Sequence, residues 1–155
     1  MAMTEPIFQP KPDQTDYTHA RWAPVINCVV KYGDKILVVE RSKGLRFYPG
    51  YWNGISGFLD DGRSLEEKVR DELLEEVGIA GEDIVSIRLG AIFDQEAPEL
   101  GKTWIVHPVF VEVKTDQVRL DWEAQGHRWV TPDEVKTLNL LPGFERVLDA
   151  VASLV

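Results

Sequence analysis

Residues 57–79 read GFLDDGRSLEEKVRDELLEEVGI, and they carry the strongest local signals in the chain. Ser64 and Glu67 have the spacing of a capping box, in which each side chain satisfies a free backbone N–H of a helix's first turn. Apolar residues recur at every fourth position after this cap, which places them on one stripe of a helix. Gly78 follows, where helices commonly end in the left-handed conformation. The stretch therefore predicts a helix over residues 64–77.

The predicted helix is strongly acidic. Ten of residues 60–83 are Asp or Glu and three are Lys or Arg. Glu72, Glu75 and Glu76 are spaced three and four apart, so they project from one side near the helix C-terminus, where the macrodipole disfavours negative charge. A solvated acidic face is one interpretation. The other is a hard-oxygen site for Mg²⁺ or Mn²⁺, because the glycine-rich loop before the helix can bring backbone carbonyls close to these carboxylates.

The rest of the chain alternates β-rich segments with helices. The predicted elements are strands at 25–30 and 36–40 around a Gly33-Asp34 turn, one short strand within 44–62, β-rich segments 84–93 and 103–113 separated by an acidic loop at 94–101, short strands near 119–122 and 128–130, a capping box at 131–134, and a last helix from Pro142 to the end. This order predicts an α/β fold in which a mixed sheet is flanked by helices.

The length and the net charge of the chain limit its possible functions. A chain of 155 residues suits one domain, which we assign to residues 21–155, preceded by a polar N-terminal arm over residues 1–20. The formal net charge of −9 argues against a nucleic-acid polymer or an anionic membrane as the main partner. Cys28 is the only cysteine, and no apolar run approaches the ~18 residues of a membrane span, so a cytoplasmic protein is predicted.

The acidic stretch resembles the signature of the Nudix hydrolase superfamily. That signature reads Gly, five residues, Glu, seven residues, Arg-Glu, an aliphatic, one residue, Glu-Glu, one residue, Gly, an aliphatic, and the matching residues here are Gly57, Glu72, Leu73, Glu75, Glu76, Gly78 and Ile79. The resemblance implies a Nudix-type α/β/α sandwich with a mixed β-sheet. It also implies hydrolysis of a nucleoside diphosphate linked to another group, with Mg²⁺ or Mn²⁺ held by the three glutamates.

The sequence departs from the family pattern in three places. Arg63 stands where the family has Glu, and Asp71 where it has Arg, so the ion pair that these two positions typically form is expected here with reversed signs. The reversal can preserve the structural link, but Asp71 adds a negative charge beside Glu72. Ile55-Ser56 replaces the usual Pro-Gly, and the resemblance implies that the Ser56 carbonyl is the backbone ligand of the metal.

Glu123 is a candidate outside the signature. It lies on the predicted loop 121–127, where some family members carry a glutamate that binds metal or acts as a base. A plain surface glutamate is an equal alternative. The resemblance therefore implies that Glu72, Glu75 or Glu123 accepts a proton from water.

Substrate-binding candidates follow the second predicted strand. Arg41 and Arg46 can hold phosphate oxygens, and Tyr48 and Tyr51 can stack on a nucleobase, whereas solvated arginines and core rings are the alternatives. The implied partner is a small-molecule nucleotide, and the small chain favours a nucleoside triphosphate or a modified nucleotide, acted on by a monomer or a homodimer. A Nudix-like domain that binds a nucleotide or a protein with weak turnover is the alternative, which the reversed pair favours.

Overall fold

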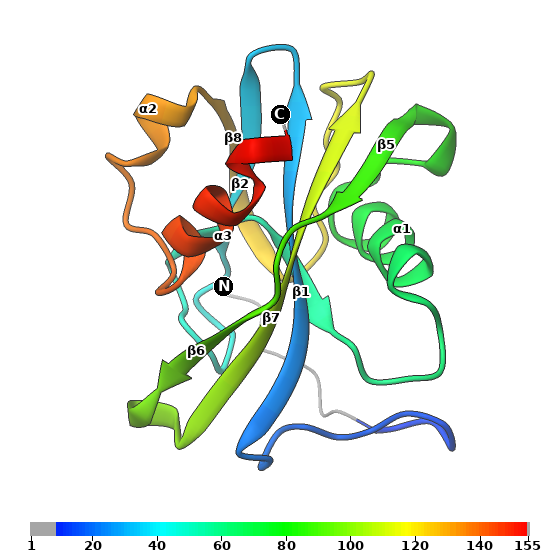
Figure 1. Ribbon diagram of the computed structural model, residues 1–155, viewed down its shortest axis with the longest axis vertical. Coiled ribbons are helices and arrows are strands. Elements are labelled where there is room, and N and C mark those ends of the chain that lie inside the picture. The colour runs from blue at the N-terminus through cyan, green and yellow to red at the C-terminus, as the bar shows by residue number, and fades with distance from the viewer. Residues whose placement is uncertain (1–8, 155) are drawn as a thin grey trace.

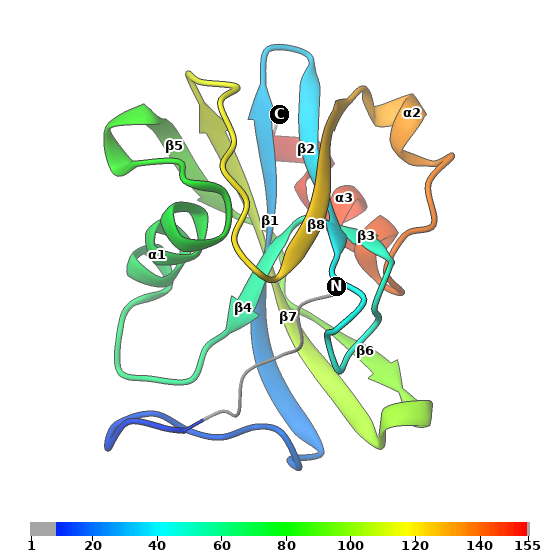
Figure 2. The same cartoon turned by 180° about the vertical axis from the view of Figure 1, so that it is seen from behind.

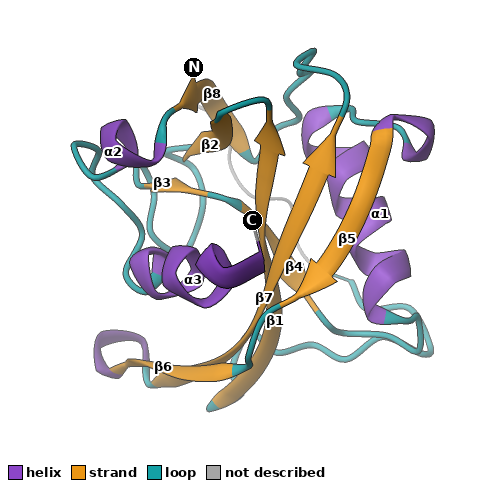
Figure 3. Ribbon diagram, turned by 45° about the horizontal axis from the view of Figure 1, so that its top comes forward, coloured by secondary structure: helices purple, strands orange, loops and turns teal. Residues whose placement is uncertain are grey.

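A mixed β-sheet lies between helices on its two faces (Figures 1 and 3). The structure is a computed structural model that describes residues 9–154. The helices are α1 (Leu65–Val77), α2 (Pro132–Val135) and α3 (Phe144–Val151), with short 3-10 turns η1 (Gly81–Asp83), η2 (Pro98–Leu100) and η3 (Ala152–Leu154). The strands are β1 (Trp22–Tyr32), β2 (Lys35–Arg41), β3 (Trp52–Asn53), β4 (Ile55–Phe58), β5 (Ile84–Leu89), β6 (Phe93–Ala97), β7 (Lys102–Val113) and β8 (Ala124–Val130).

Strand β1 is the centre of the sheet. It pairs parallel with β7 and antiparallel with β2 and β4. Strands β5 and β6 pair antiparallel with β7, and β3 and β8 pair antiparallel with β2, as the rear view in Figure 2 shows for β8. The predicted mixed sheet and α/β/α sandwich are thus confirmed. None of the helices within residues 9–154 is long and apolar enough to cross a membrane.

Two apolar cores hold the layers together, one on each face of the sheet. Along β1, Ile26, Cys28 and Val30 pack towards α1, whereas Val29 packs with the core of α3. Strands β2 and β7 divide their apolar side chains between the same two cores. Successive side chains of a strand point to opposite faces, so inner strands of a sheet covered on both sides must be apolar throughout. This need explains why the run VINCVV in the first strand is apolar except at Asn27.

Helix α1 forms as the sequence predicts. The Ser64 hydroxyl accepts a hydrogen bond from the backbone N–H of Glu67, and the Glu67 carboxylate accepts one from the backbone N–H of Ser64. Gly78 ends the helix with φ at 72°, in the left-handed region. Val69, Leu73 and Val77 face the sheet and are fully buried. The acidic residues are therefore left on the sides of a firmly seated helix.

Two predictions about irregular segments are wrong. Residues 94–101 are not an acidic loop, because Phe93–Ala97 forms β6 on the outer edge of β7 and only the 3-10 turn of Pro98–Leu100 follows. Charged side chains are common on edge strands, where they face solvent and discourage further pairing. Residues 44–62 hold two short strands, β3 and β4, where one was expected.

The predicted short strand at 119–122 is also absent. The backbone N–H of Arg119 donates to the Val77 carbonyl, at 2.9 Å, and that of Asp121 donates to the Glu76 carbonyl, at 3.2 Å. The last carbonyls of a helix have no partner within the helix, so this extended segment satisfies them in place of a strand. It thereby brings the loop carrying Glu123 against the end of α1.

Residues 9–20 pass below the loop that joins β4 to α1 (Figures 1 and 2). The backbone N–H of Thr15 donates to the Asp60 carbonyl at 2.6 Å, and the buried Lys102 ammonium donates to the carbonyls of Tyr17 and Ala20. Residues 1–8 of the predicted arm lie outside the described residues. The division into an arm and a domain over 21–155 stays a prediction.

Candidate active site

One cleft of about 750 Å³ lies between α1, the loop at 121–123, strands β3, β4 and β7 and the N-terminal segment. The predicted site residues that line it are Arg41, Arg46, Tyr48, Ser56, Arg63, Asp71, Glu72, Glu75 and Glu123. Two predicted residues do not line it. Glu76 is buried in the protein, and Tyr51 packs edge-on against Tyr48, with ring centroids 5.9 Å apart.

Glu76 lies at the most enclosed point of the acidic cluster. Its side chain is 7% exposed, and its Oε2 atom has no hydrogen-bond partner in the described part of the chain. Burial raises the pKa of Glu76 well above its usual value, and the hydrogen-bonded Glu123 and the nearby Glu72 raise it further. A buried carboxylate in this position is costly unless a proton or a cation neutralises it.

The pKa values of two neighbouring carboxyl groups are raised in the same way. Burial raises the pKa of Glu72 to about 8, with further upward effects from Glu123 and Glu75. Burial also raises the pKa of Asp121 to about 6, and Glu123 adds to this although the Glu123 backbone N–H donates to the Asp121 carboxylate at 2.9 Å. The carboxylates of α1 and of the loop therefore share one region of uncompensated negative charge.

Gly57 of β4 leaves room for the Glu72 side chain. A Cβ atom placed on Gly57 would lie 2.6 Å from both the Cδ and Oε1 atoms of Glu72, closer than real Cβ contacts. Glycine at this position thus reflects a close approach between strand and helix, and any larger residue would displace the carboxylate.

A buried chain of hydrogen bonds leads to Ser56, which lines the cleft. The Asn27 amide donates to Asn53 Oδ1 at 2.9 Å, and the Asn53 amide donates to the Ser56 hydroxyl at 3.3 Å. Asn27 and Asn53 are 5% and 2% exposed and come from β1 and β3. Sequence reasoning missed both asparagines, although a polar residue inside the apolar run VINCVV was a visible signal.

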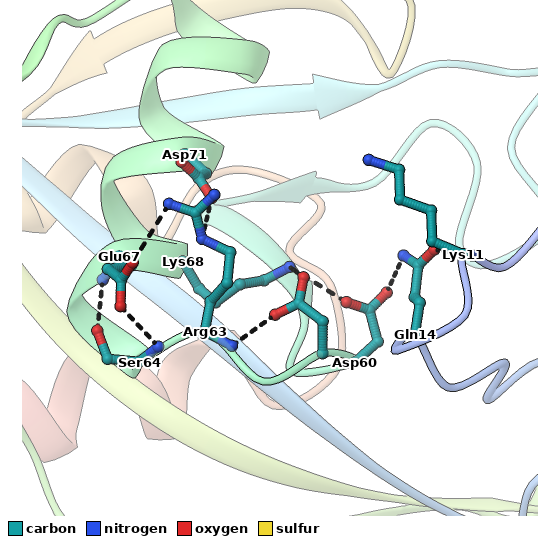
Figure 4. Close-up of polar contacts among 9 residues, drawn as sticks. Lys11, Gln14, Asp60, Arg63, Ser64, Glu67, Lys68 and Asp71 are labelled. Carbon is teal, nitrogen blue, oxygen red and sulfur yellow. Dashed lines mark hydrogen bonds and ion pairs between the residues drawn. The ribbon is translucent and has the colours of Figure 1, made fainter.

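Ion pairs fix the base of α1, as Figure 4 shows. The ammonium of Lys68 lies 3.1 Å from Asp60 Oδ1 and 3.3 Å from Asp61 Oδ2, with all three side chains largely buried. Arg63 Nε lies 3.2 Å from Asp71 Oδ2, so the two reversed positions are in contact. Neither the two aspartates nor their partner Lys68 was among the predicted site residues.

The opposite part of the cleft is basic and aromatic. Arg41 Nε donates to the Phe47 carbonyl at 3.0 Å, and the Arg46 guanidinium lies 5.7 Å from the centre of the Phe47 ring. The Tyr48 hydroxyl donates to Glu99 Oε1 at 3.1 Å. Trp104 of β7 also lines the cleft and packs edge-on against Phe47. Trp104 was not predicted, since nothing local marks which face of a long strand meets a cleft.

The donor set suits a divalent cation in its chemistry. Carboxylate oxygens, one of them buried and without a hydrogen-bond partner among residues 9–154, are the ligands that Mg²⁺ and Mn²⁺ prefer. Within residues 9–154, however, no three His, Cys, Asp or Glu side chains are arranged as a ready-made metal site. The residues fit such an ion if side chains at the mouth of the cleft, such as the exposed Glu75, rotate towards the buried ones.

Fold and site together define an α/β protein with a carboxylate-bearing helix beside a ligand-sized cleft. The sequence pattern of the NUDIX domain matches residues 21–151, and the chain belongs to this family. The family, the fold and the assignment to the Nudix hydrolases, predicted from residues 57–79, are confirmed.

Individual relatives show how far the similarity extends. The chain is 24% identical over 128 residues to the uncharacterized Nudix hydrolase YvcI of Bacillus subtilis, covering 81% of this chain and 76% of that protein. It is 32% identical over 120 residues to the mouse mitochondrial NAD(P)H pyrophosphatase NUDT13, covering 77% of this chain but only 32% of the relative. Among solved structures, the NUDIX domain of Shewanella oneidensis NrtR complexed with ADP ribose superposes with a TM-score of 0.72 at 16% identity, covering 86% and 88% of the two chains.

Proposed function

We propose that the protein is a divalent-cation-dependent pyrophosphohydrolase that cleaves a phosphoanhydride bond in a nucleoside diphosphate linked to another group. The observation that carries the proposal is that Glu72 and Glu123 line one cleft and lie close to the buried Glu76, whose Oε2 atom has no hydrogen-bond partner among residues 9–154. Mg²⁺ or Mn²⁺ bound there would neutralise phosphate charge and lower the pKa of a bound water.

The acidic residues serve two purposes in this proposal, to hold the cation and to accept a proton. The carboxylates of Glu72, Glu75 and Glu76 and the backbone carbonyl of Ser56 would hold the cation. Glu123 approaches from the separate loop after Asp121, so it can serve either as a further ligand or as the group that accepts the proton of the attacking water. Glu72 and Glu75 are the other candidates for this acceptor.

The substrate of the proposal is a small-molecule nucleotide. The cleft, at about 750 Å³, lies within the ~300–1,000 Å³ range of small-molecule pockets. Arg41 and Arg46 border it and can pair with phosphate oxygens, and Tyr48 offers a ring beside them. The ADP ribose bound to the Shewanella NUDIX domain and the NAD(P)H named for the mouse relative support this class of substrate. Nucleoside triphosphates and modified nucleotides belong to the same class.

A nucleotide-binding domain with weak turnover is the second candidate, and the reversed pair favours it. Asp71 lines the cleft and adds a carboxylate next to Glu72, where the family pattern has an arginine. Its partner Arg63 is half exposed, so its charge is screened by solvent. This candidate retains nucleotide binding and predicts little hydrolysis with either cation.

A nucleotide screen with matched variants separates the two candidates. The parent, Glu72→Gln and Glu66→Gln are assayed for released phosphate or pyrophosphate with Mg²⁺, with Mn²⁺ and with EDTA. Glu66 lies on the same helix but is exposed and paired with Arg70, so its variant is the control. Hydrolysis by the parent and the control that EDTA and Glu72→Gln abolish supports the hydrolase. Saturable nucleotide binding by a parent that hydrolyses none of the nucleotides supports the binding domain.

A further inference from the structure

Residues 9–20 precede the part of the chain that matches the NUDIX domain, yet they form one wall of the cleft. We propose that Tyr17, carried on this segment, is a specificity-determining residue whose ring bounds an aromatic subsite for a planar heteroaromatic ring of the substrate. The other members of this subsite are Phe47, Phe58 and Trp104. The inference rests on the proposed function only for the position of the phosphate groups beside the carboxylates.

The first anchor of the segment is Asp60. Its backbone carbonyl accepts the N–H of Thr15 at 2.6 Å, and its Oδ2 atom accepts the Gln14 amide at 2.9 Å, as Figure 4 shows for Gln14. The other carboxylate oxygen of Asp60 pairs with Lys68 of α1. The segment is therefore tied, through one buried aspartate, to the helix that carries the acidic cluster.

The second anchor is Lys102, the first residue of β7. Its side chain is 5% exposed, and its ammonium donates to the carbonyls of Tyr17, at 2.6 Å, and of Ala20, at 2.7 Å. Hydrogen bonds from a charged donor are stronger than neutral ones, and a buried ammonium must keep its partners. The backbone is thus held on both sides of the Tyr17 ring.

The four rings form a continuous row. Tyr17 stacks on Phe58 with centroids 6.0 Å apart and planes at 15°, Phe58 lies 6.0 Å from Trp104, and Trp104 meets Phe47 edge-on at 5.4 Å. All four rings line the cleft and are only partly buried. Rings that served core packing alone would be enclosed, whereas partly exposed rings in a cleft suit a planar ligand.

Positive charge beside the row matches the ligand proposed. The Lys102 ammonium lies 5.7 Å and 5.8 Å from the ring centres of Phe47 and Trp104, and Arg46 lies over the same Phe47 ring. A ring-bearing anion, such as a nucleotide, would therefore place its ring on the aromatic row and its phosphates among basic groups.

The test compares adenosine monophosphate with ribose 5-phosphate, which carries a hydroxyl group in place of the base, by isothermal titration calorimetry. Tyr17→Ala should weaken binding of adenosine monophosphate roughly three- to tenfold, the worth of one aromatic contact, and leave ribose 5-phosphate unchanged. Tyr17→Phe, which keeps the ring, and Tyr32→Ala, at the far end of β1, should bind both like the parent. The proposal would be overturned if the parent bound the two probes equally. It would also be overturned if Tyr17→Ala weakened the binding of neither probe or of both probes.

A second variant tests the anchor. Lys102→Met should speed hydrogen exchange over residues 11–20 and weaken binding of adenosine monophosphate more than that of ribose 5-phosphate, whereas Lys114→Met, at the other end of the β7 region, should do neither. Unchanged exchange or unchanged nucleotide binding in Lys102→Met contradicts the anchoring role. Neither experiment requires turnover, so a chain that binds the base selectively but hydrolyses nothing would refute the proposed hydrolase and leave this subsite standing.

Discussion

Replacing Glu72 by glutamine should stabilise the metal-free protein at pH 8 and change it little at pH 5. The pKa of Glu72 is raised from 4.5 to about 8 by burial and by Glu123 and Glu75. Between these two pH values the folded protein binds more protons than the unfolded chain, so the free energy of unfolding of the parent falls as pH rises. Glutamine has nearly the same shape and stays neutral, so the variant lacks this loss.

The magnitude follows from the width of that window. At pH 7 the unfolded Glu72 carboxyl is ionised and the folded one is largely protonated, so the parent has lost at most about 3 kcal/mol relative to acid pH, at about 1.4 kcal/mol per pH unit. At pH 5 the corresponding loss is below about 1 kcal/mol. The stability gain of Glu72→Gln should therefore grow steadily from pH 5 to pH 8.

Urea unfolding in EDTA at pH 5, 6, 7 and 8 measures this gain directly. Glu66→Gln is the matched control, because Glu66 is exposed and its pair with Arg70 is worth only a few tenths of a kcal/mol. Added Mg²⁺ should reverse the order at pH 8, because it would stabilise the parent through binding and not the Glu72 variant. Parallel stability curves for the parent and Glu72→Gln across this pH range would refute the assignment of a buried, strained carboxyl.

Three further predictions concern the groups around this carboxyl. Gly57→Ala should lower turnover about 10²-fold by displacing the Glu72 carboxylate, whereas Gly62→Ala, whose added Cβ meets nothing within 4 Å, should keep parental steady-state kinetics. Glu123→Gln should lower kcat with little change in KM, and an unchanged kcat would return this residue to a surface role. Arg63→Glu and Asp71→Arg should each lower the melting temperature or turnover, and the double variant should recover both; a double-mutant cycle with strictly additive effects would show that the two residues do not interact.

Local signals in the sequence predicted the elements whose causes are local. The capping box at Ser64 and the left-handed Gly78 set the ends of α1 within a residue, because cap hydrogen bonds form between neighbours. The spacing of Glu72, Glu75 and Glu76 placed all three on the acidic side of that helix. Of these, Glu72 and Glu75 line the cleft. The same holds for the second capping box, which begins α2.

Features that depend on distant partners were not predictable from local pattern. The segment at 94–101 looks like a loop because its charges face solvent, and only the open edge of β7 makes part of it a strand. The segment at 119–122 is extended because it completes the end of α1. The aromatic row draws Tyr17, Phe58 and Trp104 from three separate parts of the chain, so no spacing within the sequence marks it.

The reversed pair changes the electrostatics of the site more than the attachment of the helix. Arg63 and Asp71 remain in contact, but their side chains are 48% and 31% exposed, so the pair is worth less than about 1 kcal/mol. The family pattern has an arginine at position 71, so the reversal removes a cation beside Glu72 on α1. Lys68 supplies one from the same helix, since its charge lowers the pKa of Glu72 against the effects of burial and of the other carboxylates. Asp60 holds that ammonium in a buried pair, which costs about 3–5 kcal/mol to break on one side, far more than an exposed pair. Lys68, and not Arg63, is therefore the basic residue that partly offsets the negative charge around Glu72.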